Sequence, residues 1–239
     1  MLNFEVDPDC LIPLVPPGTE LDLFDGRCLV SIVAFEFGDA RLYGVRIPGY
    51  QSFPEVNLRF YVRRWVDDAW RRGVVFIKEL VPARIVALIA RRVFGQNFAH
   101  APTTYQIECG ESDRVTGLRY DWRVNGRPCF AAAAVLAPSS DAEHEFVAEH
   151  YYAYATRGSG CIEYRVEHRP WIIHSVATCT CDLNAERVYG VRIGRWLRAE
   201  PRSALYADGS AVAVYSGVRR NSGSVCDGSK GAYSFAPCS

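Results

Sequence analysis

The segment Phe53-Pro54-Glu55-Val56-Asn57-Leu58-Arg59-Phe60-Tyr61-Val62-Arg63 decides the fold of this protein. Apolar and polar residues alternate along it, and this period of two is typical of a β-strand with one face in the core. The apolar face carries Val56, Leu58, Phe60 and Val62. The opposite face carries the residues that we call the first polar row: Glu55, Asn57, Arg59 and Tyr61. This row faces either solvent or the inside of a barrel, and only in the second case does it line a pocket.

The whole chain has the composition of an ordinary folded protein. It has 239 residues, 49% hydrophobic and 23% charged, which is enough for a sizeable core. The formal net charge is zero and the pI is about 6.9. This balance gives no electrostatic footprint for nucleic acid or for an acidic membrane.

The cysteines and the N-terminus indicate a cytoplasmic protein. The nine cysteines are odd in number and contain no C-x-x-C pair, which predicts reduced thiols and no metal or cofactor. Cys179 and Cys181 share one face of a predicted strand, and two ligands alone make a poor metal site. The first residues show no signal peptide, and the apolar helical segment at 85–94 is too short to span a bilayer.

Turn and cap signals divide the chain into many short elements. Strands are expected at 27–37, 41–47, 55–63, 73–80, 103–109, 114–124, 128–136, 161–168, 171–181 and 211–218. Helices are expected at 7–15, 82–94, 139–150 and 201–206. Asn125-Gly126 and Gly158-Ser159-Gly160 are expected to be hairpin turns. The pattern predicts one α+β domain at 1–220, mainly antiparallel β, followed by a disordered Gly/Ser-rich tail at 221–239.

Several blocks of the sequence resemble the YqjF-like family of bacterial proteins, a family of unknown function whose fold is similar to that of acetoacetate decarboxylase. The resemblance runs from Asn3 to Val218. The blocks that carry it are 15–22, 55–63, 72–77, 149–152 and 162–168. It implies a closed, cone-like antiparallel barrel with a small polar cavity inside.

The decarboxylase of that fold works through a Schiff-base lysine, which lies in a tyrosine-proline-lysine-lysine segment after the long helix. The corresponding stretch of this chain, 94–101, contains no lysine. Lys78 precedes the predicted helix at a strand end, where it is expected to face water beside Glu79. The resemblance therefore does not extend to imine chemistry at a lysine.

A second polar row alternates with apolar residues further along the chain. It consists of Glu163, Arg165 and Glu167. If both rows face the barrel interior, Arg59 is expected to pair with Glu163 or Glu167, and Arg165 with Glu55. In the functional interpretation, one arginine holds a ligand carboxylate and an acid, Glu55 or Glu163, moves protons. In the structural interpretation, the same pairs only fix the strand register.

An aromatic cluster at the end of the 139–150 helix adds two candidates. His150 is a candidate general base, although the helix dipole is a sufficient structural reason for a histidine there. Tyr152 is a candidate ligand contact beside Asn57, Arg59, Tyr61 and Arg165.

Two hypotheses follow from these residues. The first is a barrel that binds a small organic acid or carbonyl metabolite, with Arg59 as the anion anchor and, if it is an enzyme, lyase-type chemistry without a Schiff-base lysine. The second is a non-catalytic structural or interaction protein whose polar rows are satisfied ion pairs. Both are compatible with a homo-oligomer.

Overall fold

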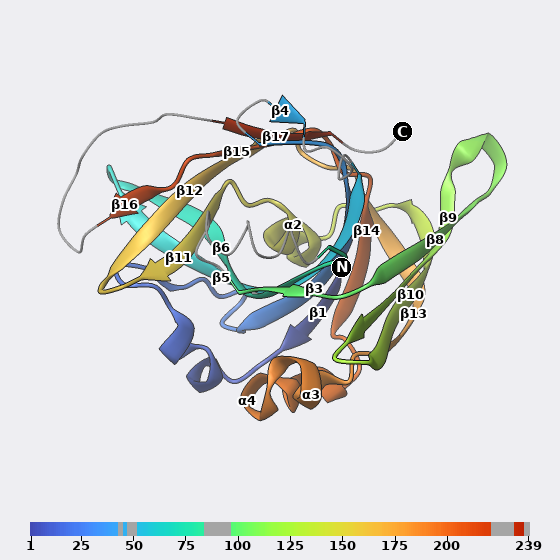
Figure 1. The fold of residues 1–239 in the computed structure, drawn as a ribbon, viewed down its shortest axis with the longest axis horizontal. Helices are drawn as coiled ribbons and strands as arrows, with labels where there is room; N and C mark the ends of the chain where they lie inside the picture. The colour runs from blue at the N-terminus through green and yellow to red at the C-terminus, as the bar shows by residue number, and fades with distance from the viewer. Residues whose placement is uncertain (43–44, 47–51, 84–96, 221–231, 237–239) are drawn as a thin grey trace.

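The computed structural model describes residues 1–42, 45–46, 52–83, 97–220 and 232–236 (Figure 1). Its strands are β1 (Leu2–Glu5), β2 (Glu20–Leu21), β3 (Leu29–Leu42), β4 (Val45–Arg46), β5 (Phe53–Val66), β6 (Ala69–Val81), β7 (Phe98–His100), β8 (Thr103–Cys109), β9 (Val115–Val124), β10 (Arg127–Pro138), β11 (Tyr152–Arg157), β12 (Gly160–His168), β13 (Ile173–Asp182), β14 (Ser203–Ala207), β15 (Val212–Tyr215), β16 (Val218–Arg220) and β17 (Ala232–Ala236). The described helices are α2 (Ala142–Ala148), α3 (Ala185–Tyr189) and α4 (Val191–Gly194), with 3₁₀ turns η1 (Pro8–Cys10), η2 (Ile12–Leu14), η3 (Glu111–Asp113) and η4 (Trp196–Arg198).

Strand β5 lies between β3 and β6 and pairs antiparallel with both. Strand β6 then pairs in parallel with β11, which pairs antiparallel with β12. Figure 1 shows these strands curving around α2, with α3 and α4 on the outside. The prediction of a mainly antiparallel α+β fold is confirmed by these pairings.

The two faces of the curved sheet bury two different hydrophobic clusters. The face toward α2, which we call the inner face, packs residues such as Leu29, Tyr61 and Val74 against Phe146 and Val147 of the helix. The opposite, outer face of β5 belongs to a cluster that includes the α3 and α4 residues at positions 185, 188 and 193. The four apolar residues of the alternating segment in β5 all lie in this outer cluster and are fully buried.

Gly73 allows the parallel contact between β6 and β11. A Cβ atom at this position would lie 2.7 Å from both the backbone oxygen of Tyr152 and the ring of Tyr154. Such a distance is shorter than any ordinary van der Waals contact. Glycine therefore brings the two strands close enough for the sheet to curve around α2.

Most of the predicted elements are present, with shifted ends. The Asn125-Gly126 hairpin is confirmed, since both residues have positive φ, 50° and 77°, and Val124 pairs with Arg127. The Gly158-Ser159 turn likewise joins β11 to β12, with Arg157 opposite Gly160. The expected helix at 139–150 is α2, capped by the Asp141 side chain.

Other predictions need correction. The expected helix at 201–206 is wrong, because Ser203–Ala207 forms β14 between β1 and β13, and sheet pairing overrides the local sequence. The helix expected at 7–15 is two separate 3₁₀ turns, with Asp7 as a cap. The helix expected at 82–94 falls almost wholly at 84–96, outside the described residues. Within the predicted tail, Ala232–Ala236 forms β17 and pairs with β15 and β3.

Candidate functional site

The first polar row is buried on the inner face of the sheet. Glu55, Asn57, Arg59 and Tyr61 are 4%, 2%, 9% and 1% exposed. Tyr61 packs against α2 residues, which fixes the direction of the whole row because alternate residues of a strand share a face. The row is therefore not the wet side of a sheet, and its polar groups need partners inside the protein.

Arg59 carries a buried positive charge that is only partly compensated. Its Nη2 donates to the backbone oxygen of Val147, 2.7 Å away, near the C-terminal end of α2. Its Nε has no hydrogen-bond partner, and the guanidinium forms no ion pair with a carboxylate of the described residues. The partial negative charge of a helix C-terminus compensates such a cation only in part.

Tyr61 anchors the α2 end of the row. Its hydroxyl shares a short hydrogen bond with the Ser31 hydroxyl and lies 3.3 Å from the Val147 oxygen. Ser31 in turn donates to the Asn3 side chain at 2.7 Å, which links β1, β3, β5 and α2. Because every member of this chain has a partner, it holds Tyr61 rigidly beside Arg59.

His150 stacks on Tyr61, with ring centroids 4.8 Å apart, and is buried. Burial first, and the nearby Arg59 second, hold the pKa of His150 well below its usual range. The expected gain from the helix dipole is therefore outweighed here. A neutral imidazole with so low a pKa is a weak base, which argues against His150 as the general base.

A further buried acid, Glu79, escaped the sequence analysis. It lies directly opposite Asn57 in the β5–β6 ladder and is 4% exposed. A β-bulge at Ile77 places Glu79 and Phe76, three residues apart, opposite Asn57 and Arg59. Strict alternation along β6 would put these two residues on different faces, so the bulge hides Glu79 from a period-two pattern. The only sequence signal is a charged Lys78-Glu79 pair ending an apolar strand.

Glu55 and Glu79 form a pair of acids with unusual protonation. Asn57 Nδ2 donates to Glu55 Oε1 at 3.2 Å, while burial raises the pKa of Glu55 to about 7. The pKa of Glu79 is raised well above its ordinary value, first by burial and second by the charge of Glu55. Near neutral pH the pair therefore holds a proton on Glu79, while Glu55 is partly ionised.

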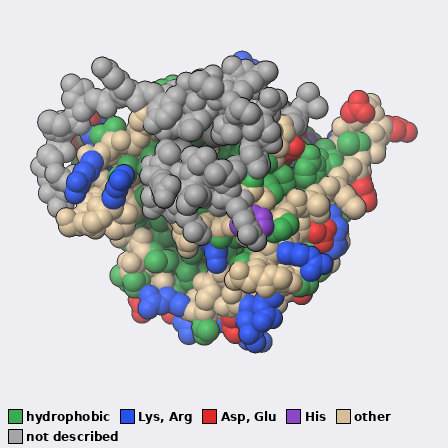
Figure 2. All heavy atoms as spheres, in the orientation of Figure 1, with side chains coloured by type: hydrophobic (Ala, Val, Ile, Leu, Met, Phe, Trp, Pro, Cys, Tyr) green, Lys and Arg blue, Asp and Glu red, His purple; other side chains and the backbone are tan. Residues whose placement is uncertain are grey.

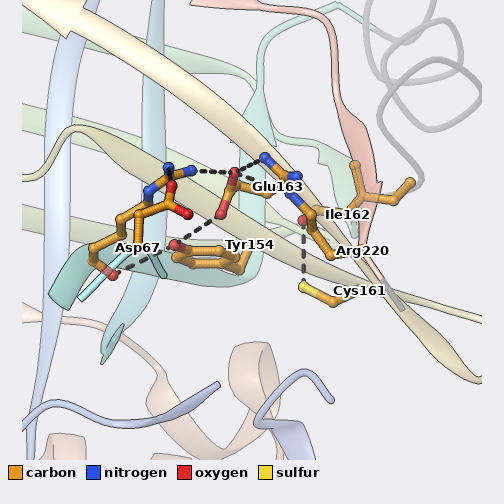
Figure 3. A network of polar contacts seen from close by, with 7 residues as sticks. Asp67, Tyr154, Cys161, Ile162, Glu163 and Arg220 are labelled. Carbon is orange, nitrogen blue, oxygen red and sulfur yellow. Dashed lines mark hydrogen bonds and ion pairs between the residues drawn. The ribbon is translucent and has the colours of Figure 1, made fainter. Parts of the chain in front are cut away.

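The second polar row lies on the outer face of the sheet, away from the first. On β12, Ile162 and Tyr164 belong to the inner cluster, so Glu163 between them points outward. Glu163 Oε1 pairs with Arg71 Nη1 at 3.1 Å and Arg220 Nη2 at 2.8 Å. Its Oε2 accepts from the Tyr154 hydroxyl at 3.3 Å (Figure 3). The expected pairing of Arg59 with Glu163 is therefore wrong.

The remaining residues of the second polar row also have partners outside the first polar row. Arg165 pairs with Glu167 at the surface, and Tyr215 donates to Glu167 at 2.6 Å, so the expected pairings of Arg165 with Glu55 and of Glu167 with Arg59 are wrong. Tyr152 stacks on Tyr154, on the outer side, with centroids 6.3 Å apart. The structure brings neither Arg165 nor Tyr152 to the first row.

Lys78 does not face water as expected. It is half-buried, and its Nζ donates to the backbone oxygen of Val188 in α3 at 2.5 Å. This contact lies on the outer side of the sheet, since Val188 belongs to the outer cluster. Lys78 therefore holds α3 and lies on the other side of the strand from Glu79.

Other kinds of site find little support in the described part of the chain. No three histidine, cysteine or acidic side chains there are placed to hold a metal ion. The seven cysteines in these ranges are all free thiols. None of the described helices has the length and apolar character needed to cross a bilayer. Figure 2 shows basic and acidic side chains interspersed over the visible face, with acids at the tip of the β8–β9 hairpin.

Comparison with solved structures places the fold in the acetoacetate-decarboxylase-like class. The enduracididine biosynthesis enzyme MppR complexed with pyruvate aligns with a TM-score of 0.60 at 12% identity, covering 98% of this chain and 84% of that one. An acetoacetate decarboxylase-like enzyme from Sphingomonas wittichii RW1 aligns with a TM-score of 0.55 at 14% identity, covering 98% and 85%. At these identities the likeness concerns the fold alone.

Sequence comparison gives the family. The profile of the DUF2071 family, described as an uncharacterized conserved protein, matches residues 1–211. The chain therefore belongs to the DUF2071 family. The uncharacterized protein YqjF of Bacillus subtilis (strain 168) is 26% identical over 175 residues, which cover 72% of this chain and 71% of YqjF. The resemblance noted in the sequence to YqjF-like proteins is confirmed.

Proposed function

We propose that this protein binds a small oxo acid or similar carboxylate on the inner face of the sheet, with Arg59 holding the carboxylate. The observation that carries the proposal is the buried Arg59 guanidinium, which no carboxylate of the described residues neutralises. A buried charge without a partner is costly, and a guanidinium suits a carboxylate by forming two parallel hydrogen bonds. A ligand carboxylate would complete this charge pair.

The acid needed for chemistry lies on the same face. Glu55, with a pKa raised to about 7 by burial, suits a general acid or base at neutral pH. Glu163 is not proposed for this role, since its ion pairs lie on the outer face. We propose lyase-type or related proton chemistry without a Schiff-base lysine, because Lys78 lies on the outer side of β6.

The surrounding architecture is consistent with this proposal. A structural neighbour of the same fold class is a biosynthetic enzyme solved with pyruvate bound. We propose that the strands around α2 form the closed, cone-like barrel expected from the sequence, within one domain at 1–220 of a cytoplasmic protein. Such a barrel would shield the first polar row from bulk water and strengthen its electrostatics.

A thermal-shift series tests the proposal. Pyruvate, acetate and longer oxo acids are added to the wild type, to Arg59→Met and to Arg165→Met, whose arginine is exposed and paired on the outer face. A ligand at about 100 times its Kd should stabilise the wild type by about 2.7 kcal/mol. We expect this shift to be lost in Arg59→Met and kept in Arg165→Met. No shift of the wild type with any of these carboxylates would refute the proposal.

A structural role is the second candidate, because Arg59 and Tyr61 both hydrogen-bond the Val147 oxygen near the end of α2. In that case Arg59→Met would unfold at a lower temperature and no carboxylate would stabilise the wild type. The same series therefore separates the two roles.

A further inference from the structure

We infer that Glu55 and Glu79 act together as a proton-transfer pair that interconverts the keto and enol forms of a small oxo acid held at Arg59. This inference rests on the proposed function, since Arg59 must first hold the ligand carboxylate. It adds Glu79 to the site and names the reaction as proton abstraction next to a carbonyl.

The sheet register brings the two acids together. Glu79 of β6 lies opposite Asn57, the residue between Glu55 and Arg59 on the inner face of β5. Asn57 Nδ2 holds Glu55 Oε1 at 3.2 Å. The bulge at Ile77 puts Glu79 on the same face as Phe76, opposite Asn57, and bulges commonly re-aim a side chain next to an active site.

Buried polar atoms around the pair lack partners. Glu79 Oε2 and Asn57 Oδ1 have no hydrogen-bond partner among the described residues, although both side chains are at least 96% buried. Arg59 Nε, also buried, is unpartnered as well. Three such atoms on one face are unusual, because buried polar groups are nearly always hydrogen-bonded. Of these groups, Arg59 Nε and a protonated Glu79 can donate to the carboxylate and carbonyl oxygens of an oxo acid.

Few other charged groups act on this pair. Burial raises the pKa of Tyr164, which lies on β12 within the inner cluster, so Tyr164 stays a neutral phenol. His150 is held neutral by burial and Arg59. On β5 itself the pair faces the amide of Asn57 and the cation of Arg59, and β3 contributes Ser31 opposite Arg59. The buried Met1 amino group lies near Arg59, but burial first, and Arg59 second, lower its pKa to about 5, so it is neutral at pH 7. Arg59 is thus the main charge that a bound anion would meet near neutral pH.

The spacing suits a short ligand. A strand rises about 3.3 Å per residue, so Asn57 and the facing Glu79 lie about 7 Å along β5 from Arg59. Two hydrogen bonds of about 2.9 Å take up most of this distance, which suits a ligand whose carboxylate and carbonyl carbons are directly bonded. Short 2-oxo acids such as pyruvate are therefore the expected class.

The proposed step is balanced within the pair. The Glu55 carboxylate takes a proton from the carbon next to the ketone, and the electrons of that C–H bond form the C=C bond of the enol. The π electrons of the C=O bond move to the carbonyl oxygen, which takes the proton of Glu79. The pair holds one proton before and after the step, with its place exchanged. The reverse step returns the ketone, and no oxidant or reductant is needed.

Hydrogen–deuterium exchange tests the inference without knowledge of the natural substrate. Pyruvate is incubated in D₂O with the wild type, Glu55→Gln, Glu79→Gln and the exposed control Glu167→Gln, and loss of the methyl proton signal is followed by NMR. We expect catalysed exchange in the wild type and the control, and a rate about 100-fold lower in Glu55→Gln and Glu79→Gln. The wild-type rate should rise as Glu55 ionises near pH 7 and fall when Glu79 ionises at higher pH.

Pyruvate binding, measured on the same samples by thermal shift, separates the two proposals. Pyruvate that stabilises the wild type without exchange above the protein-free rate overturns the proton-transfer pair and leaves the binding site standing. Unchanged exchange in either Glu→Gln variant also overturns the pair. No stabilisation by pyruvate or the longer oxo acids overturns both.

Discussion

The first polar row, at 55–61, and the second polar row, at 163–167, lie on neighbouring parts of one sheet but on its opposite faces. Both alternate acids and arginines with apolar residues, yet β5 turns its row toward α2 and β12 turns its row away. On the outer face, Glu163 has two arginines and a tyrosine as partners. On the inner face, Arg59 has a backbone oxygen and no acid among the described residues, while Glu55 and Glu79 face an amide. The difference between a structural row and a ligand site is therefore the completeness of charge pairing.

The largest expected loss of stability comes from removing the ion pairs of the second polar row. Glu163→Gln removes the counter-charge that Arg71 and Arg220 share in a mostly buried position, and leaves Arg71 its ion pair with the exposed Asp67. Loss of one partner of a buried ion pair typically costs about 3 kcal/mol or more. Urea denaturation should show this loss, with the pyruvate-induced shift retained. A cost under about 1 kcal/mol would mean that this network is not structural.

The buried acids of the first polar row should make the unfolding free energy depend on pH. Because the pKa of Glu55 is raised from 4.5 to about 7, the folded state binds its proton more tightly than the unfolded state does. This stabilisation is complete below pH 4.5 and is lost as the pH rises through 7, on the order of 3 kcal/mol in all. Glu79 acts in the same direction at higher pH. Glu55→Gln should flatten the decline in unfolding free energy between pH 4.5 and 7, whereas exposed Glu167→Gln should not.

Tyr61→Phe tests how much the first polar row contributes to the stability of the fold. The hydroxyl bonds Ser31 and Val147, so its removal should cost about 1 kcal/mol of unfolding free energy. The pyruvate shift should persist, since Arg59 keeps its position through Val147. Loss of binding together with normal stability would instead place the Tyr61 hydroxyl on the ligand.

The smallest effect on stability and binding is expected at the exposed end of the second polar row. Arg165 is exposed and paired with Glu167, and such pairs contribute at most about 1 kcal/mol. Arg165→Met should change neither the melting temperature by more than a degree or two nor the response to pyruvate. A strong loss of pyruvate binding in this variant would move the site to the outer face.

The sequence predicts the features that depend on neighbouring residues, and it does not predict those that depend on pairing between distant segments. The alternation in 55–63 predicts the strand and its two faces, because side-chain direction along a strand has period two. It does not predict which face meets α2, since that depends on pairing between segments about 100 residues apart. For this reason the sequence does not predict which way the β12 row faces relative to the β5 row, and the bulge at Ile77 hides Glu79 from a period-two pattern. Arg59, Asn57 and Glu55 are predictable from the sequence because they alternate with apolar residues along one strand.

The central claim is that the first polar row is a ligand site, with its positive charge on Arg59 and its proton on the pair Glu55 and Glu79. Calorimetric titration of pyruvate at pH 5.5 and pH 8.0 tests this claim most directly. Protonation of Glu55 at the lower pH leaves Arg59 as the main nearby charge, so an anion should bind more tightly there. The account predicts a severalfold lower Kd at pH 5.5 and proton uptake on binding near pH 7, both absent in Arg59→Met. An affinity that is equal at the two pH values, or no binding at either, would contradict it.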